Sequence, residues 1–182
     1  SPLSAYAPVG SGCPALKVDR TVGVVKAYST CVGQGPFVGE LFGEAGDALR
    51  EAGQEYGAAT GRPRRVAWID LVATRYGAKL QAATEIVLTK LDVLSYLDEI
   101  PLCVAYRKGD GETRDFPYTS ELDACEPVYE TMPGWKCDIS GARTYSELPK
   151  EARDYVERIE REIGCPISYV SVGAQRDALI RR

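Results

Sequence analysis

The chain has 182 residues, 45% of them hydrophobic, with 22 Lys and Arg against 26 Asp and Glu, and therefore a formal net charge of −4. This composition is ordinary for a globular protein and argues against binding to duplex nucleic acid or to an anionic membrane, both of which favour a basic surface. No stretch approaches the ~20 apolar residues of a membrane-spanning helix, and the opening SPLSAYAPVGSG has no signal-peptide pattern.

The first half of the chain contains two predicted strands and two predicted helices. Residues 21–30 (TVGVVKAYST) are apolar and β-branched, which predicts a buried strand. Apolar residues recur at helical spacing from Val38 to Ala52, so we predict a helix over 38–52 that Gly53 ends. Residues 66–83 regain a helical pattern, and residues 84–92 (TEIVLTKLD) predict a short buried strand.

The second half adds a hairpin, a helix and a strand. Residues 101–117 predict a hairpin around Asp110-Gly111, and residues 146–164 predict a helix capped by Ser146, with Pro149 in its first turn and Gly164 at its end. Residues 165–173 predict a last strand. This alternation favours an α/β (mixed α+β) fold, in which helices flank a mixed sheet.

The end of the predicted strand 84–92 carries Lys90 and Asp92, spaced by one residue. A carboxylate there can accept two parallel hydrogen bonds, and guanine offers two adjacent donors, its ring N–H and its exocyclic amine. Adenine offers no such pair on that edge. The alkyl stem of the lysine can lie along the face of the base. The alternative is an ordinary strand end that reaches solvent.

Two further segments contain residues that suit anionic or nucleotide ligands. The loop Thr60 to Arg65 (TGRPRR) carries three arginines, whose planar forks match carboxylates and phosphates. A solvated basic loop is the alternative. Residues 171–173 (SVG) could offer a hydroxyl and a backbone N–H, or be a simple turn.

The sequence has six cysteines without a CxxC pair, and no histidine. The cysteine spacing favours reduced, mostly buried thiols over a disulfide scaffold. The lack of histidine removes Ser-His and Cys-His nucleophile pairs, so chemistry must come from Asp, Glu, Lys, Arg or Tyr. Neither GxxxxGK[ST] nor GxGxxG occurs, so no phosphate-binding loop is identified.

Taken in order, these segments resemble the carboxy-terminal part of the adenylosuccinate synthetase family. The segments are VVKAYST, VGQGPF, EYGAATGRPRR, LTKLDVLSYLDE, LCVAY, EPVYETMPGW and ISYVSVG. The resemblance implies the carboxy-terminal domain of a P-loop-like GTP-dependent ligase. It implies the reaction of IMP, L-aspartate and GTP to adenylosuccinate, GDP and phosphate with Mg²⁺, which commits IMP to AMP biosynthesis. It also implies a cytoplasmic homodimer.

The resemblance assigns roles to three segments. The GTP-binding residues would be Arg64, Lys90, Leu91, Asp92, Ser171, Val172 and Gly173. The aspartate- and IMP-binding loop would be Ala58, Ala59, Thr60, Gly61, Arg62, Pro63 and Arg64. Arg62 would approach the IMP ribose, and Arg64 the nucleotide phosphates. Ala59 and Val172 stand where the family usually has threonine.

The family's glycine-rich loop, its catalytic Asp and its catalytic His find no counterpart in this sequence. The resemblance therefore implies no catalytic residue and no metal ligand in this chain, which we expect to be part of a longer enzyme and inactive alone. Residues 1–29 would be a remnant of the main nucleotide-binding sheet, and residues 30–182 the carboxy-terminal domain. A non-catalytic guanine-nucleotide-binding module is the alternative.

Overall fold

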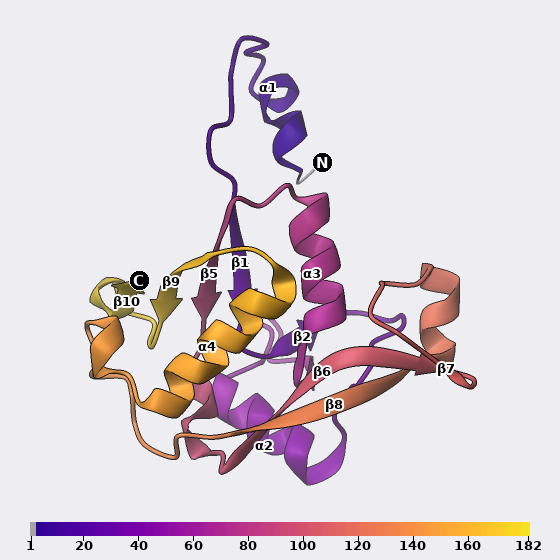
Figure 1. Cartoon of the computed structure of the whole chain (residues 1–182), viewed down its shortest axis with the longest axis vertical. Coiled ribbons are helices and arrows are strands. Elements are labelled where there is room, and N and C mark those ends of the chain that lie inside the picture. Colours follow the sequence, from indigo (N-terminus) through magenta and orange to yellow (C-terminus); the bar gives the residue numbers. More distant parts are fainter. Residues whose placement is uncertain (1–2) are drawn as a thin grey trace.

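A computed structural model describes residues 3–182 (Figure 1). Its helices are α1 (Ala7–Gly10), α2 (Gly43–Gly53), α3 (Leu71–Leu80) and α4 (Lys150–Ile163). Its strands are β1 (Val22–Lys26), β2 (Ser29–Cys31), β3 (Arg65–Ala67), β4 (Ile69–Asp70), β5 (Glu85–Thr89), β6 (Glu99–Lys108), β7 (Gly111–Thr113), β8 (Glu126–Pro133), β9 (Ile167–Ser171) and β10 (Leu179–Arg181). Helices flank sheets of mixed strand direction, which confirms the predicted fold class.

The largest described core includes α4 and the sheet β1-β5-β9-β10 (Figure 1) and extends to residues of α2, α3 and β6. Strands β1, β5 and β9 are parallel, and β10 is antiparallel to β9. One face of α4 is fully buried because its apolar residues recur at helical spacing, namely Ala152, Tyr155, Val156, Ile159 and Ile163. Since the carboxyl ends of parallel strands lie at one edge, the segments after β5 and β9 lie side by side.

A second sheet is built on the long strand β6, which crosses the lower part of the view in Figure 1. Strand β6 pairs with β4, β7 and β8, and the β6–β7 pair confirms the hairpin predicted around Asp110-Gly111. A small antiparallel pair, β2 and β3, completes the sheets. This pair sets Cys31 opposite Arg65 and so positions the start of the basic segment.

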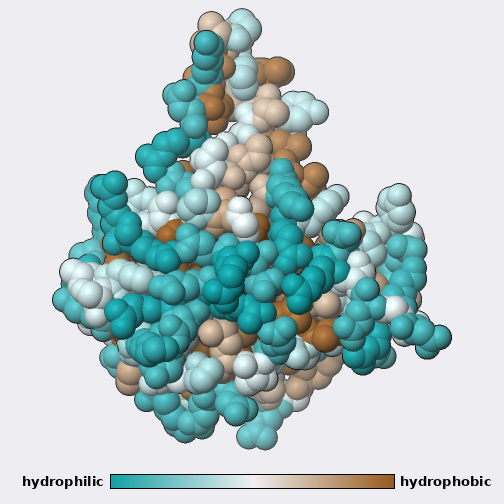
Figure 2. Space-filling model, viewed as in Figure 1, coloured by the Kyte–Doolittle hydropathy of each residue, from teal (hydrophilic) through white to brown (hydrophobic). Residues whose placement is uncertain are grey.

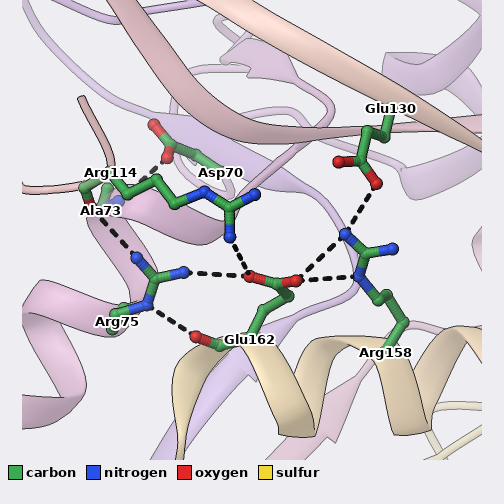
Figure 3. Close-up of polar contacts among 7 residues, drawn as sticks. All are labelled: Asp70, Ala73, Arg75, Arg114, Glu130, Arg158 and Glu162. Carbon is green, nitrogen blue, oxygen red and sulfur yellow. Dashed lines mark hydrogen bonds and ion pairs between the residues drawn. The ribbon is translucent and has the colours of Figure 1, made fainter. Parts of the chain in front are cut away.

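Several element boundaries differ from the sequence-based prediction. The predicted strand 21–30 is two strands, β1 and β2, because buried Ala27 and Tyr28 turn the chain from one sheet to the other. The predicted helix 66–83 starts only at Leu71, where the Asp70 carboxylate caps α3 by accepting from the backbone N of Ala73 at 2.9 Å (Figure 3).

The two other predicted helices also begin later than expected. Helix α2 starts only at Gly43. Gly39 and Gly43 both have left-handed backbone angles, so the chain before this point cannot continue a right-handed helix. Helix α4 starts after Pro149, and Ser146 does not cap it. Instead, Thr144 and Glu147 form a capping box on a preceding short 3-10 turn. Gly164 ends α4 in the left-handed conformation, as predicted.

The surface in Figure 2 is mostly hydrophilic, and apolar residues gather toward the protruding amino-terminal segment at its top. Strand β1 pairs with β5 on one side, and within residues 3–182 no strand covers its other edge. Val24 on β1 is 71% exposed. The division between residues 1–29 and 30–182 stays a prediction.

All six cysteines are unpaired, but only Cys103 and Cys165 are buried, so the expectation of mostly buried thiols was wrong. None of the helices in residues 3–182 combines the length and the apolar character that a membrane crossing would require.

Candidate functional site

The segment predicted to bind guanine follows β5 directly. Lys90 adopts a left-handed backbone with φ of 61°, which turns the chain sharply away from the strand. Leu91 is fully buried, and its backbone N donates to the carbonyl of Ser171 at 3.2 Å. This hydrogen bond joins the two segments that were predicted to contact guanine, although they lie about 80 positions apart in the sequence.

Asp92 starts a short 3-10 turn, and its carboxylate is half-buried. Within residues 3–182 its Oδ1 atom is buried and has no hydrogen-bond partner. Burial raises the pKa of Asp92, and the nearby Asp138 adds to this effect. A buried acceptor without a donor is costly, so this oxygen is suited to a ligand that supplies one.

Residues 171–173 are held largely by contacts within the chain. The Ser171 hydroxyl donates to the Gly173 carbonyl at 2.8 Å, so it has only its lone pairs left for a ligand. The Val172 backbone N donates to the Ala178 carbonyl at 3.0 Å, and its side chain lies in the core. The Val172 side chain, which stands where the family usually has threonine, therefore faces the core.

The predicted aspartate loop is an exposed turn beside a cleft. The Gly57 backbone N donates to the Arg62 carbonyl at 2.8 Å, the Gly61 backbone N donates to the Gly57 carbonyl at 2.8 Å, and Gly61 has a φ of 65°. Ala58, Ala59 and Pro63 are exposed around this turn. The cleft has a volume of about 760 Å³ and is lined by Cys31, Val32, Gly33, Gln34, Gly35, Gly57, Thr60, Arg62, Pro63, Arg64 and Arg65.

The three arginines of this loop differ in what holds them. Arg65 is paired with Glu40 at 2.6 Å, and Arg64 donates from Nη1 to the Glu55 carboxylate at 2.7 Å. The Arg62 guanidinium is exposed and has no hydrogen-bond or ion-pair partner within residues 3–182. Of the three, Arg62 therefore has its full fork open to a carboxylate or phosphate.

A buried carboxylate that the sequence did not single out lies between the two predicted sites. Glu55 is 0% exposed. Its Oε1 accepts from Lys26 Nζ at 2.8 Å and from the Tyr28 hydroxyl at 2.5 Å, and lies 3.3 Å from Lys90 Nζ. Its Oε2 accepts from Arg64. No local pattern marks Glu55, because its four partners come from three separate segments of the chain.

The charge on Glu55 is retained despite burial. Burial alone would raise the pKa of Glu55, but hydrogen bonds from Lys26, Tyr28 and Arg64 outweigh it and hold the pKa at about 2. A carboxylate whose pKa is depressed in the folded state stabilises the fold above its unfolded pKa, and this contribution is lost as the pH falls toward 2.

We expect Glu55→Gln to lower the free energy of unfolding by about 3 kcal/mol at pH 7, because the cations around it lose their shared anion. The deficit should fall to about half by pH 3, where an unfolded glutamate is already protonated. Urea unfolding from pH 7 to pH 3 measures this. Glu51→Gln, at an exposed position four residues earlier, is the control and should change stability by less than about 0.5 kcal/mol. A deficit that is independent of pH would contradict the assignment.

No group of three or more His, Cys, Asp or Glu side chains within residues 3–182 is placed to hold a metal ion.

A protein-family model described as adenylosuccinate synthetase matches residues 1–180. The chain is 52% identical to the adenylosuccinate synthetase of Bifidobacterium adolescentis, over 100% of this chain and 42% of that protein. It is also 52% identical to the chloroplastic adenylosuccinate synthetase of Nicotiana tabacum, over 99% of this chain and 36% of that protein.

A solved structure gives the same match in three dimensions. The fully ligated adenylosuccinate synthetase of Plasmodium falciparum superimposes with a TM-score of 0.92 at 40% identity, over 99% of this chain and 44% of that one. The chain thus spans less than half the length of the relatives described here.

Proposed function

Because the chain belongs to the adenylosuccinate synthetase family, we propose that it supplies the guanine-binding and aspartate-binding residues of a GTP-dependent ligase. The ligase would convert IMP and L-aspartate to adenylosuccinate. The 6-oxygen of IMP would first take the γ-phosphoryl group of GTP and release GDP. The amine of aspartate would then attack carbon 6, and the phosphate would leave with the oxygen.

The observation that carries this proposal is the buried, unpartnered Oδ1 atom of Asp92. Guanine would place its ring N–H and its exocyclic amine on the two carboxylate oxygens, while adenine would leave the buried oxygen without a donor. Lys90 borders the same position, and Ser171, Val172 and Gly173 would line the other side of the base. GTP, and not ATP, would therefore be the phosphoryl donor.

The loop Ala58 to Arg64 would hold the aspartate substrate. Arg62, open on the cleft, would bind a substrate carboxylate with its fork and approach the IMP ribose. Arg64 would reach the carboxylates and the nucleotide phosphates with the donors that Glu55 does not use. Mg²⁺ stays an expectation of the family resemblance.

Residues 1–182 contain no histidine and no GxxxxGK[ST] segment. We therefore expect residues 1–182 alone to bind ligands without turnover. The free thiols fit a reducing compartment such as the cytoplasm, and a homodimer is proposed on the resemblance alone.

The test is adenylosuccinate formation by the protein isolated from its source, with IMP, L-aspartate, Mg²⁺ and either GTP or ATP. Turnover at least about 100-fold faster with GTP supports the ligase. Guanine-selective binding without turnover would instead support the non-catalytic guanine-nucleotide-binding module. Binding that does not discriminate between GDP and ADP would contradict both.

A further inference from the structure

Glu55 connects the two ligand sites through one carboxylate. Its Oε2 accepts from Arg64 of the aspartate loop at 2.7 Å, and its Oε1 lies 3.3 Å from Nζ of Lys90, next to the guanine-reading Asp92. Glu55 and Arg64 are joined by a second hydrogen bond, because the Arg64 backbone N also donates to the Glu55 carbonyl at 2.9 Å. A change in the side-chain conformation of either Arg64 or Lys90 therefore acts on the same carboxylate.

The cations around Glu55 differ from it in exposure. Glu55 is completely buried, whereas the side chains of Lys26, Arg64 and Lys90 are 27%, 33% and 36% exposed. The carboxylate is thus enclosed by the protein, whereas the side chain of each cation is partly open to solvent. Three cations share one carboxylate, so positive charge remains for anionic ligands.

Within the described chain, Nζ of Lys90 has one other hydrogen-bond partner, the Gly53 carbonyl at 2.6 Å. Gly53 is the last residue of α2, and Glu55 follows it by two positions. The guanine segment is therefore attached to the same turn of chain that leads into the aspartate loop. A base that fixes the Lys90 stem would order this turn, and Arg64 with it.

We propose that Glu55 is a positioning residue that couples guanine-nucleotide binding at Lys90 and Asp92 to aspartate binding at Arg64. A ligand that orders one cation orders the shared carboxylate, so the second ligand meets a cation that is already in place. Binding of the two ligands is then mutually favourable by the same factor in both directions. This inference rests on the proposed function, since that function defines the two ligands.

The experiment measures the dissociation constant of GDP for the protein isolated from its source or its recombinant equivalent, with IMP saturating and without or with saturating L-aspartate. GDP carries no γ-phosphoryl group, so no turnover occurs. The ratio of the two constants is the coupling factor. We expect about 10 for the unchanged protein and about 1 for Glu55→Gln, with GDP binding still measurable in the variant.

A matched control is available at Glu162, a second nearly buried carboxylate shared by arginines (Figure 3). Glu162 pairs with Arg75 at 3.2 Å, with Arg158 at 3.0 Å and with Arg114 at 3.7 Å, and none of these belongs to the proposed ligand sites. Glu162→Gln should lower stability but keep the coupling factor near 10. If Glu162→Gln removes the coupling as well, general loosening explains the effect and the inference is overturned.

A second variant covers the case in which Glu55→Gln fails to fold. Glu55→Asp keeps the charge but withdraws the carboxylate by ~1.5 Å, so it cannot span Arg64 and Lys90 together. A coupling factor near 1 in folded Glu55→Asp supports the inference, and an unchanged factor overturns it. A factor of 1 in the unchanged protein overturns the inference and leaves the proposed function standing, whereas failure to prefer GDP over ADP overturns the function itself.

Discussion

Asp92→Asn is expected to weaken GDP binding by about 100-fold and to strengthen binding of xanthosine diphosphate. The amide replaces one carboxylate oxygen by an NH₂ donor, which faces the exocyclic amine of guanine donor to donor. Two charge-assisted hydrogen bonds are lost or weakened, at about 1.5 kcal/mol or more each. Xanthine carries a carbonyl oxygen where guanine carries the amine, so it accepts from the new NH₂ group.

Unfolding does not explain this expected loss. The Oδ1 atom of Asp92 is buried without a partner, and its burial raises the pKa, so removing the charge should leave stability unchanged or improve it. Asp98→Asn, at an exposed carboxylate six residues later, is the matched control and should leave nucleotide preference unchanged. The measurement is calorimetric titration of each variant with GDP, ADP and xanthosine diphosphate. If guanine preference survives in Asp92→Asn, Asp92 does not read the base.

The guanine segment could be recognised in the sequence because its signal is local. An apolar run that leads into Lys90 and Asp92 can be recognised from its own residues, although β5 itself ends at Thr89. Parallel pairing of β5 with β9 then places the segment beside Ser171. The loop that carries Arg62 could also be recognised from local sequence, because it contains Gly61, Pro63 and closely spaced arginines.

Glu55 could not be found in this way. Its partners lie 29, 27, 9 and 35 positions away in the sequence, so only the folded chain brings them to one carboxylate. A glutamate just after a helix is normally a solvated residue, and nothing in its neighbours marks it as buried. Buried polar clusters of this kind depend on tertiary contacts that residue periodicity does not report.

The helix boundaries were misplaced for a related reason. Val66, Ala67 and Ile69 fit a helical pattern together with the residues that follow, yet they are buried in β3 and β4. A short apolar run is compatible with a buried strand as well as with a helix. Which of the two forms here is decided by pairing of β3 with β2 and of β4 with β6. Asp70 then caps α3 and sets its true start.

Arg62→Leu is expected to raise the KM for L-aspartate by about 100-fold or more, with stability nearly unchanged. The Arg62 guanidinium is exposed and unpaired within residues 3–182, so leucine removes a ligand contact and no internal one. Arg64 is a poorer test of the same idea, because Arg64→Leu would also remove a partner of buried Glu55.

Arg62→Lys separates charge from geometry at this position. Lysine keeps the positive charge but cannot make two parallel hydrogen bonds to a carboxylate, so we expect a KM between that of the unchanged protein and that of Arg62→Leu. The measurement is initial-rate kinetics with aspartate varied and IMP and GTP saturating, on the protein that carries this chain. Normal aspartate dependence in Arg62→Leu would remove the loop Ala58 to Arg64 from the aspartate site. An Arg62→Lys variant as impaired as Arg62→Leu would show that the bidentate fork, and not charge, governs recognition of the substrate carboxylate.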